Sequence, residues 1–111
     1  MAETFNNAAL SVTSSLQDLY QAPTSSGNKA IVLSVLVANC HGSAADNVTL
    51  TITNSGNTEQ SKIASTVAVP NDATLECIPN KVVLNAGEKL RIKGDQSSGY
   101  LKAFVSVLEI T

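Results

Sequence analysis

The chain has 111 residues, enough for one domain, and its seven Lys and Arg residues against nine Asp and Glu residues give a formal net charge of −2. Charged residues make up 14% of the chain and apolar residues 43%, while Ser, Thr and Asn together occupy 33 positions. This composition excludes a coiled coil, a disulfide-dense miniprotein and a disordered charged tail, and the absence of a basic excess argues against nucleic-acid binding.

Strand patterns begin near the N-terminus and continue along the chain. We assign residues 1–9 to a flexible or docking N-terminal arm, with a short helical turn allowed near Ala8. Short strands are predicted at Leu10–Thr13 and Leu16–Gln21. A loop rich in Ser and Gly then leads into a long strand at Lys29–Asn39.

The clearest strand is Asn47–Asn54, in which Val48, Leu50 and Ile52 alternate with three Thr residues that we expect to face outward. Turn residues such as Pro70-Asn71-Asp72 and Asn85-Ala86-Gly87 separate the strands that follow. These strands are predicted at Glu59–Val69, Ala73–Ile78, Lys81–Leu84, Glu88–Lys93 and Tyr100–Ile110. In Glu88–Lys93, Leu90 and Ile92 are expected to point inward.

Eight or nine strands at a spacing of about ten residues are typical of a β-sandwich or barrel. No long window carries a helical period, although a short helical turn within His41–Ala45 would fit the pattern. We therefore predict an all-β fold, a single antiparallel β-sandwich of jelly-roll-like type that spans residues 1–111.

Two of the predicted strands are apolar on both faces. A strand with one face in contact with solvent should instead alternate apolar and polar residues. In the first, Ile31, Leu33, Val35 and Val37 share one face and Val32 and Leu36 the other. In the last, Leu101, Ala103, Val105 and Val107 share one face and Tyr100, Phe104, Leu108 and Ile110 the other. No amphipathic helix is predicted that could cover the second faces.

We expect these second faces to form an interface between subunits, because a wet apolar patch of this size drives association. The residues expected there are Val32, Leu36, Tyr100, Phe104 and Leu108. The alternatives are a closed, strongly twisted barrel that hides both faces, or an N-terminal segment that packs over them.

Residues that could carry chemistry are few. The adjacent Cys40 and His41 are interpreted as part of a turn, because neighbours on an extended chain point to opposite sides and the chain has too few Cys and His residues for a structural zinc site. Cys40 and Cys77 are predicted to be buried thiols of a protein made in a reducing cytoplasm, with a disulfide as the alternative.

The carboxylates are scattered and are interpreted as turn and surface residues, with calcium binding by Asp46, Asp72 or Asp95 in end loops as the alternative. No glycine-rich phosphate loop is present. We predict that the protein is not an enzyme and has no cofactor and no metal site. The segment Met1–Asn7 lacks the features of a secretory signal, and the longest apolar stretch, Ala30 to Ala38, is too short for a membrane helix, so no membrane partner is expected.

The order of these elements resembles that of small β-sandwich virion proteins of tailed bacteriophages, including cyanophages. The segments that carry the resemblance are Leu19–Pro23, Lys29–Asn39, Val67–Glu76, Lys81–Ile92 and Gly99–Ile110. The turn Pro70-Asn71-Asp72 before Ala73-Thr-Leu-Glu76, and Leu84-Asn-Ala-Gly-Glu88 before Lys89-Leu-Arg-Ile92, match the turns of that family. Asn39-Cys40-His41 departs from the Asn-Thr or Asn-Gly loop expected there.

The resemblance implies a non-enzymatic building block of a phage virion, with capsid decoration (cement) as the leading role and a homotrimer as the favoured assembly. It implies partners among the major capsid protein and other virion proteins, and a location in the virion after assembly in the host cytoplasm. The alternatives are a neck or tail component, a carbohydrate- or receptor-binding module at a tail tip, and a bacterial surface or pilus-type subunit.

Overall fold

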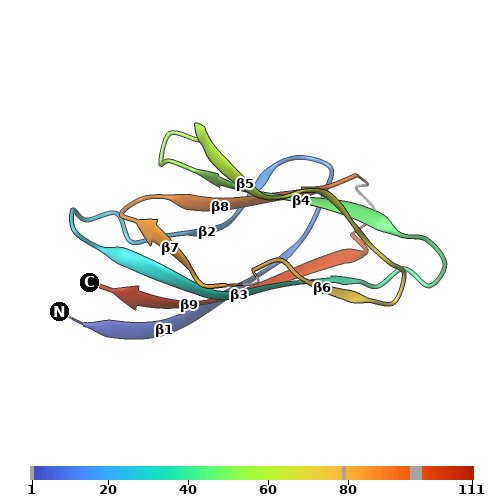
Figure 1. Ribbon diagram of the computed structural model, residues 1–111, viewed down its shortest axis with the longest axis horizontal. Helices are drawn as coiled ribbons and strands as arrows, with labels where there is room; N and C mark the ends of the chain where they lie inside the picture. The colour runs from blue at the N-terminus through green and yellow to red at the C-terminus, as the bar shows by residue number, and fades with distance from the viewer. Residues whose placement is uncertain (1, 79, 96–98) are drawn as a thin grey trace.

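A computed structural model describes residues 2–78, 80–95 and 99–111, and these residues form nine strands and no helix. The strands make two antiparallel sheets that face each other (Figure 1). They are β1 (Glu3–Ser11), β2 (Gln17–Gln21), β3 (Lys29–Asn39), β4 (Asp46–Thr53), β5 (Glu59–Val69), β6 (Thr74–Glu76), β7 (Val82–Asn85), β8 (Lys89–Gly94) and β9 (Leu101–Ile110). The predicted all-β antiparallel sandwich is confirmed.

Sheet A has the order β1-β9-β3-β6, with β7 also paired to β3, and sheet B has the order β2-β8-β4-β5. Consecutive strands alternate between the sheets except at the β4–β5 hairpin and the β6–β7 pair. Most connections therefore cross from one layer to the other, and the jelly-roll-like character of the sandwich stays a prediction. The two terminal strands β1 and β9 lie side by side in sheet A (Figure 1).

The core fills the space between the sheets with aliphatic side chains from both layers. Alternation within each strand produces this arrangement, since every second side chain points to the same face. In β8, Leu90 and Ile92 are fully buried as predicted, whereas Lys93 is exposed. The largest fully buried side chains are Leu50, Leu84, Leu90, Ile92, Leu101, Val12, Val32, Val35, Val37, Val48, Val69 and Val105.

Residues 3–9 of the N-terminal arm predicted for residues 1–9 belong instead to β1, and Met1 lies outside the described residues. Every residue from Glu3 to Ser11 has a partner on β9. Ala8 therefore lies in a strand rather than in a helical turn, and its side chain packs against the core together with that of Leu10. The segment His41–Ala45 is also not helical, since it contains only a bend.

A β-bulge in β3 changes which side chains face the core. The pairing with β9 shifts between Val32 and Ser34, so the residues before and after this point differ in parity. Val32, Val35 and Val37 are all fully buried, and the prediction that Val32 lies on the interface face is wrong. The bulge cannot be read from the alternation, because Leu33 is itself apolar and continues the pattern.

The Thr residues of β4 are not on a wet face as predicted. Thr49, Thr51 and Thr53 are 7%, 3% and 1% exposed. They lie on the outer side of sheet B, directly opposite Lys93, Arg91 and Lys89 of β8. Long aliphatic stems of Lys and Arg cover neighbouring surface while their charged ends stay in water, and this arrangement buries the short Thr side chains between them.

Candidate assembly surface

The outer face of sheet A carries two rows of apolar side chains, which the pairing registers align across the strands. In the first row, Phe5 of β1 lies opposite Leu108 of β9, Leu108 opposite Ile31 of β3, and Ile31 opposite Val83 of β7. Directly opposed residues of an antiparallel pair share a face, so these four side chains form a continuous stripe. We call it the Phe5 row.

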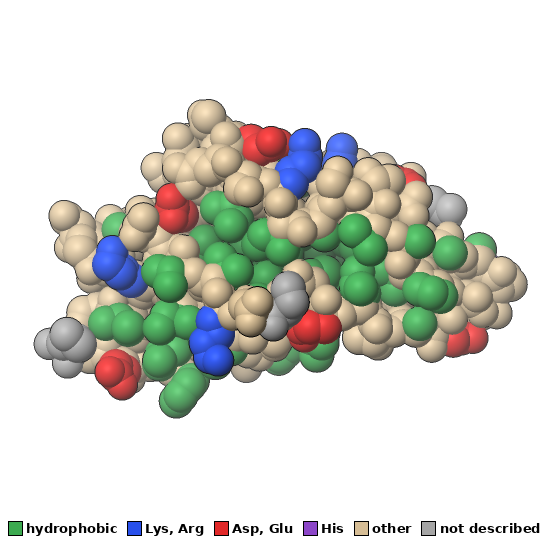
Figure 2. Space-filling model, viewed as in Figure 1, with side chains coloured by type: hydrophobic (Ala, Val, Ile, Leu, Met, Phe, Trp, Pro, Cys, Tyr) green, Lys and Arg blue, Asp and Glu red, His purple; other side chains and the backbone are tan. Residues whose placement is uncertain are grey.

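The ends of the Phe5 row are the most exposed large apolar side chains of the described chain. Phe5 is 75% exposed and Val83 is 57% exposed, whereas Leu108 and Ile31 between them are half-buried. Figure 2 shows hydrophobic side chains gathered over β7 and the neighbouring part of β3. The single chain therefore leaves this stripe in contact with water.

The second row crosses β1, β9 and β3 at Ala9, Phe104 and Leu36. Phe104 is 40% exposed and Leu36 is 39% exposed, and they lie directly opposite each other. We call this the Phe104 row. A polar row that contains Asn7 and Ser106 separates it from the Phe5 row.

Three of the five predicted interface residues lie on this face. Leu36 and Phe104 face each other in the Phe104 row, and Leu108 belongs to the Phe5 row. Val32 points into the core because of the bulge in β3. Tyr100 precedes β9 and is 42% exposed, but its ring packs edge-on against His41 with centroids 4.4 Å apart. A role for these residues in an interface stays a prediction.

Phe5, Ile31 and Val83 belong to the same face and were missed by sequence reasoning. Phe5 stands alone in a polar segment that we assigned to an arm. The alternation of the sequence puts Ile31 on the same face as Val35, because it does not reveal the bulge that separates them. The available signal was Phe5 itself. Every second side chain of a strand points to the same face, so an isolated aromatic residue in a polar segment fits the outer face of a strand.

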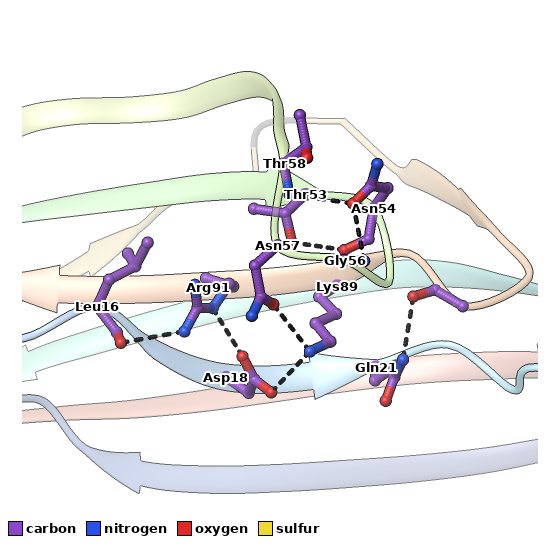
Figure 3. Close-up of polar contacts among 11 residues, drawn as sticks. Leu16, Asp18, Gln21, Thr53, Asn54, Gly56, Asn57, Thr58, Lys89 and Arg91 are labelled. Carbon is purple, nitrogen blue, oxygen red and sulfur yellow. Dashed lines mark hydrogen bonds and ion pairs between the residues drawn. The ribbon is translucent and has the colours of Figure 1, made fainter.

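The outer face of sheet B is polar and cross-linked by charged side chains. Asp18 of β2 accepts a hydrogen bond from Arg91 Nε at 2.7 Å and pairs with Lys89 Nζ at 3.2 Å (Figure 3). Lys89 also donates to Asn57 Oδ1 at 2.9 Å, and Arg91 donates to the Leu16 carbonyl at 3.3 Å. The contacts tie β2, β8 and the β4–β5 turn together.

The balance of effects on Asp18 favours its charged form. Burial raises the pKa of its carboxyl group, but the hydrogen bonds and charges of Lys89 and Arg91 together outweigh burial and hold the pKa below its usual value. Because the Asp18 side chain is 47% exposed, each pair contributes only a fraction of a kcal/mol, up to about 1 kcal/mol. This face is therefore a solvated surface, in contrast to the outer face of sheet A.

Cys40 and His41 follow the end of β3 and precede a bend at Gly42 and Ser43, so the predicted turn is present only as this bend. The Nδ1 atom of His41 accepts the backbone N–H groups of Ser43 and Ala44 at 3.0 and 3.1 Å. The buried Asn39 holds this turn in place, since its Nδ2 donates to the carbonyls of Ala44 and Val69. With Nδ1 engaged by the turn, His41 is not arranged to activate the neighbouring thiol.

The two thiols differ from the prediction that both are buried. Cys77 is buried, but Cys40 is exposed, and neither is in a disulfide within the chain. Burial, with a smaller effect of the Glu76 carboxylate, raises the pKa of the Cys77 thiol to about 11. A thiol with such a pKa is protonated near neutral pH and is a poor nucleophile.

Asp46 and Asp95 meet at one end of the sandwich. The carboxylate of Asp46 accepts the backbone N–H groups of Asn47 at 2.8 Å and Asp95 at 3.2 Å, and Asn47 Nδ2 donates to Asp95 Oδ2 at 2.7 Å. These bonds connect two loops. Within residues 2–78, 80–95 and 99–111, no group of three or more Asp, Glu, His or Cys residues is placed to hold a metal ion.

Among the residues that the structure describes, none forms a helix with the length and apolar character that a membrane span requires. No pocket is present among the same residues, so the surface to be explained is an extended face rather than a concave site.

The fold is a β-sandwich with two apolar rows on one outer face and a network of charged side chains on the other. No protein-family model matches the sequence, and no curated protein sequence matches it either. Solved structures do share the fold. A protein of the acidic stable capsid of Helicobacter pylori bacteriophage KHP30 superposes with a TM-score of 0.60 at 11% identity, covering 100% of this chain and 89% of that one.

A second similar structure comes from Bacillus endospore appendages, described as a novel family of disulfide-linked pili. It superposes with a TM-score of 0.59 at 13% identity, covering 99% of this chain and 87% of that one. Both likenesses extend over the whole sandwich, and at these identities they establish the fold alone.

Proposed function

We propose that the chain is a non-enzymatic structural protein of a phage virion, and specifically a capsid decoration (cement) protein. The observation that carries the proposal is the pair of apolar rows on the outer face of sheet A. A building block of this kind works by presenting such a face to copies of itself or to a lattice. The resemblance of the sequence to phage virion proteins and the likeness of the fold to a protein in a phage capsid structure both support it.

The energetics of association favour this use of sheet A. Burial of apolar surface stabilises by about 25 cal/mol per Å². A standard interface removes about 1,600 Å² from water, and its centre is poor in charged residues. The Phe5 row meets that description, because its four side chains are uncharged. The Phe104 row is uncharged from Ala9 to Leu36 and ends at Glu76 of β6, which lies opposite Leu36.

The proposed partners are other copies of the chain, in the trimer that the resemblance favours, and a major capsid protein or another virion protein. The proposed location is the virion, after assembly in the host cytoplasm. The low net charge of −2 is compatible with a surface that contacts protein rather than nucleic acid.

The test is to add the purified chain to phage capsids that lack it and to follow the melting of the capsids by scanning calorimetry. We expect the chain to bind and to raise the melting temperature. Leu36→Asp should weaken the effect, whereas Gln60→Asp places the same charge on exposed β5 of sheet B and should not. A chain that leaves capsid melting unchanged would contradict the proposal.

A second candidate is a subunit of a bacterial surface filament, which the likeness of the fold to the endospore appendage protein favours. A filament subunit should form long polymers visible by electron microscopy without any capsid. Some pilus subunits lack a strand that a neighbouring subunit supplies. Both sheets of this chain already have four or more strands of their own, which argues against a subunit of that kind.

A tail-tip carbohydrate module is less well supported by the aromatic residues. Such modules present exposed rings on which sugars stack. Here the exposed rings of Phe5 and Phe104 belong to the two apolar rows, and Tyr20 is only 8% exposed. Tyr100 is accessible, although its ring packs against His41. Saturable glycan binding that is lost in Tyr100→Ala would favour the carbohydrate module over a decoration protein.

A further inference from the structure

The four sheet edges of the sandwich are not equally protected against pairing with another chain. Natural edges are protected by being short, by bulges and by charges. Strands β6 and β7 have three and four residues, and β2 has five residues and a register shift. Strand β5 is long, but it carries three register shifts, the charges of Glu59 and Lys62, and a positive φ of 52° at Thr66.

Strand β1 has none of these protections along most of its length. It pairs with β9 through nine consecutive residues with no shift. It contains no Pro, Gly, Lys or Arg, and its single charge, Glu3, lies at its first position. It is therefore a long, regular and open edge, of the kind to which another strand can be added.

The hydrogen bonds at the ends of β1 show which backbone groups are available. Ala2 and Thr111 exchange both of their backbone bonds, at 2.8 and 2.9 Å, and Val12 N–H donates to Leu101 at 2.9 Å. Such pairs alternate along an antiparallel ladder, so the even-numbered residues of β1 bond to β9. The N–H and C=O groups of Phe5, Asn7 and Ala9 then point to the open edge.

We infer that β1 pairs antiparallel with β1 of a second copy about a two-fold axis at Asn7, joining two A sheets into one. In this register Asn7 lies opposite Asn7, Phe5 opposite Ala9 of the second copy, and Glu3 opposite Ser11 of the second copy. The inference rests on the proposed function for the premise that copies associate. It replaces the trimer that the resemblance favours with a two-fold contact, because the single β1 edge of each chain can pair with one other copy only.

This register uses the whole strand and brings no like charges together. All nine residues of each β1 are paired, and Glu3 meets a neutral side chain. A slip of two residues would place Phe5 opposite the polar residue Asn7 or Ser11, according to its direction, and would leave two residues of each strand unpaired. A slip of one residue would exchange the inward and outward faces.

The same register makes the two apolar rows continuous across the dimer. Ala9 begins the Phe104 row, and Phe5 of the second copy would lie directly beside it. The small Ala9 side chain leaves room for the phenyl ring next to Phe104. Each joined stripe would run through Val83, Ile31, Leu108 and Phe5 of one copy and then Ala9, Phe104 and Leu36 of the other. Phe5, exposed by 75% in the single chain, becomes the central contact.

A proline at position 7 tests the backbone pairing. The Asn7 N–H points away from β9 and bonds only to the Asn6 side chain, at 2.8 Å, so Asn7→Pro breaks no bond between strands of its own chain. We expect light scattering to show that Asn7→Pro halves the mass of the wild-type particle. Asn7→Ala, which keeps the N–H, should retain the wild-type mass. A wild-type monomer, or an unchanged mass in Asn7→Pro, would overturn the inference.

Cysteine cross-linking tests the register without a proline. In a Cys40→Ser background, Asn7→Cys places two thiols opposite each other, with Cα atoms about 5.5 Å apart, within reach of a disulfide. Ser11→Cys on the same strand would put them about 27 Å apart. We expect the first variant to cross-link on mild oxidation and the second not to. Equal cross-linking of both, or of neither, would contradict the register.

The outcome for this inference is separable from the outcome for the proposed function. A monomer that still raises the melting temperature of capsids would overturn the β1 pairing and leave the decoration role standing. A cross-linked β1 dimer that does not bind capsids would support the pairing and contradict the decoration role.

Discussion

The hydroxyl group of Tyr20 donates a hydrogen bond to Glu109 Oε2 at 2.5 Å and thereby connects the two sheets of the sandwich. Tyr20 belongs to β2 of sheet B and Glu109 to β9 of sheet A, 89 residues away. Burial, and to a smaller extent the Glu109 carboxylate, raises the pKa of Tyr20 well above its usual value. The phenol therefore stays protonated and keeps its donor across the physiological range.

Removal of this donor should destabilise the fold. Tyr20→Phe leaves the ring in place but deprives a part-buried carboxylate of its partner, so we expect the free energy of unfolding to fall by about 1–3 kcal/mol. Urea unfolding followed by circular dichroism measures the change. Tyr100→Phe, at an exposed position, is the matched control and should change the free energy by less than about 0.5 kcal/mol. Equal effects of the two substitutions would contradict a special role for the Tyr20 hydroxyl.

Stability should decline in alkaline solution. The pKa of Tyr20 and that of Cys77 are both raised in the folded state, so the unfolded chain loses these protons first as the pH rises. Their contribution is complete below about pH 9 and is lost progressively above it, with the Cys77 part falling between about pH 9 and 11. The measurement is the free energy of unfolding from pH 7 to 11. Cys77→Ala should flatten the decline in this range, and an identical decline in that variant would contradict the assignment.

Much of the fold follows from local patterns, and the exceptions have tertiary causes. Strands such as β4 and β8 have strict alternation between turn residues, which is enough to locate them. Strand β1 has a weak pattern of its own, because Glu3 through Asn7 is mostly polar. It forms because the fold places it beside β9, and a neighbour so distant in sequence leaves no local signal.

The candidate surface was predicted in outline and not in detail, again for physical reasons. An apolar second face on β3 and β9 is visible in the sequence, and Leu36, Phe104 and Leu108 follow from it. The bulge beside Ser34 reverses the parity of half of β3, so Val32 and Ile31 were assigned to the wrong faces. A bulge depends on the pairing between strands, and the periodicity of the sequence does not indicate where it lies.

The reversed parity of β3 can be checked by paired truncations. Val32 is 0% exposed and Leu36 is 39% exposed. We expect Val32→Ala to cost about 2 kcal/mol of unfolding free energy, because it leaves a cavity in the core, and Leu36→Ala to cost less than about 1 kcal/mol in the single chain. Urea unfolding at a low protein concentration, where association does not contribute, makes the comparison. A larger loss at Leu36 than at Val32 would contradict the face assignment.

The apolar outer face of sheet A should be required for association and not for folding. Phe104→Asp places a charge in the middle of the Phe104 row, where burial against another molecule would be costly, so we expect the particle mass measured by light scattering to fall. The far-ultraviolet circular dichroism should keep its β-type spectrum, because Phe104 is 40% exposed in the single chain. Gln60→Asp introduces the same charge on exposed β5 and should leave the mass unchanged. If Phe104→Asp unfolds the protein, then Phe104 belongs to the core; if it leaves the wild-type mass unchanged, association does not use this face.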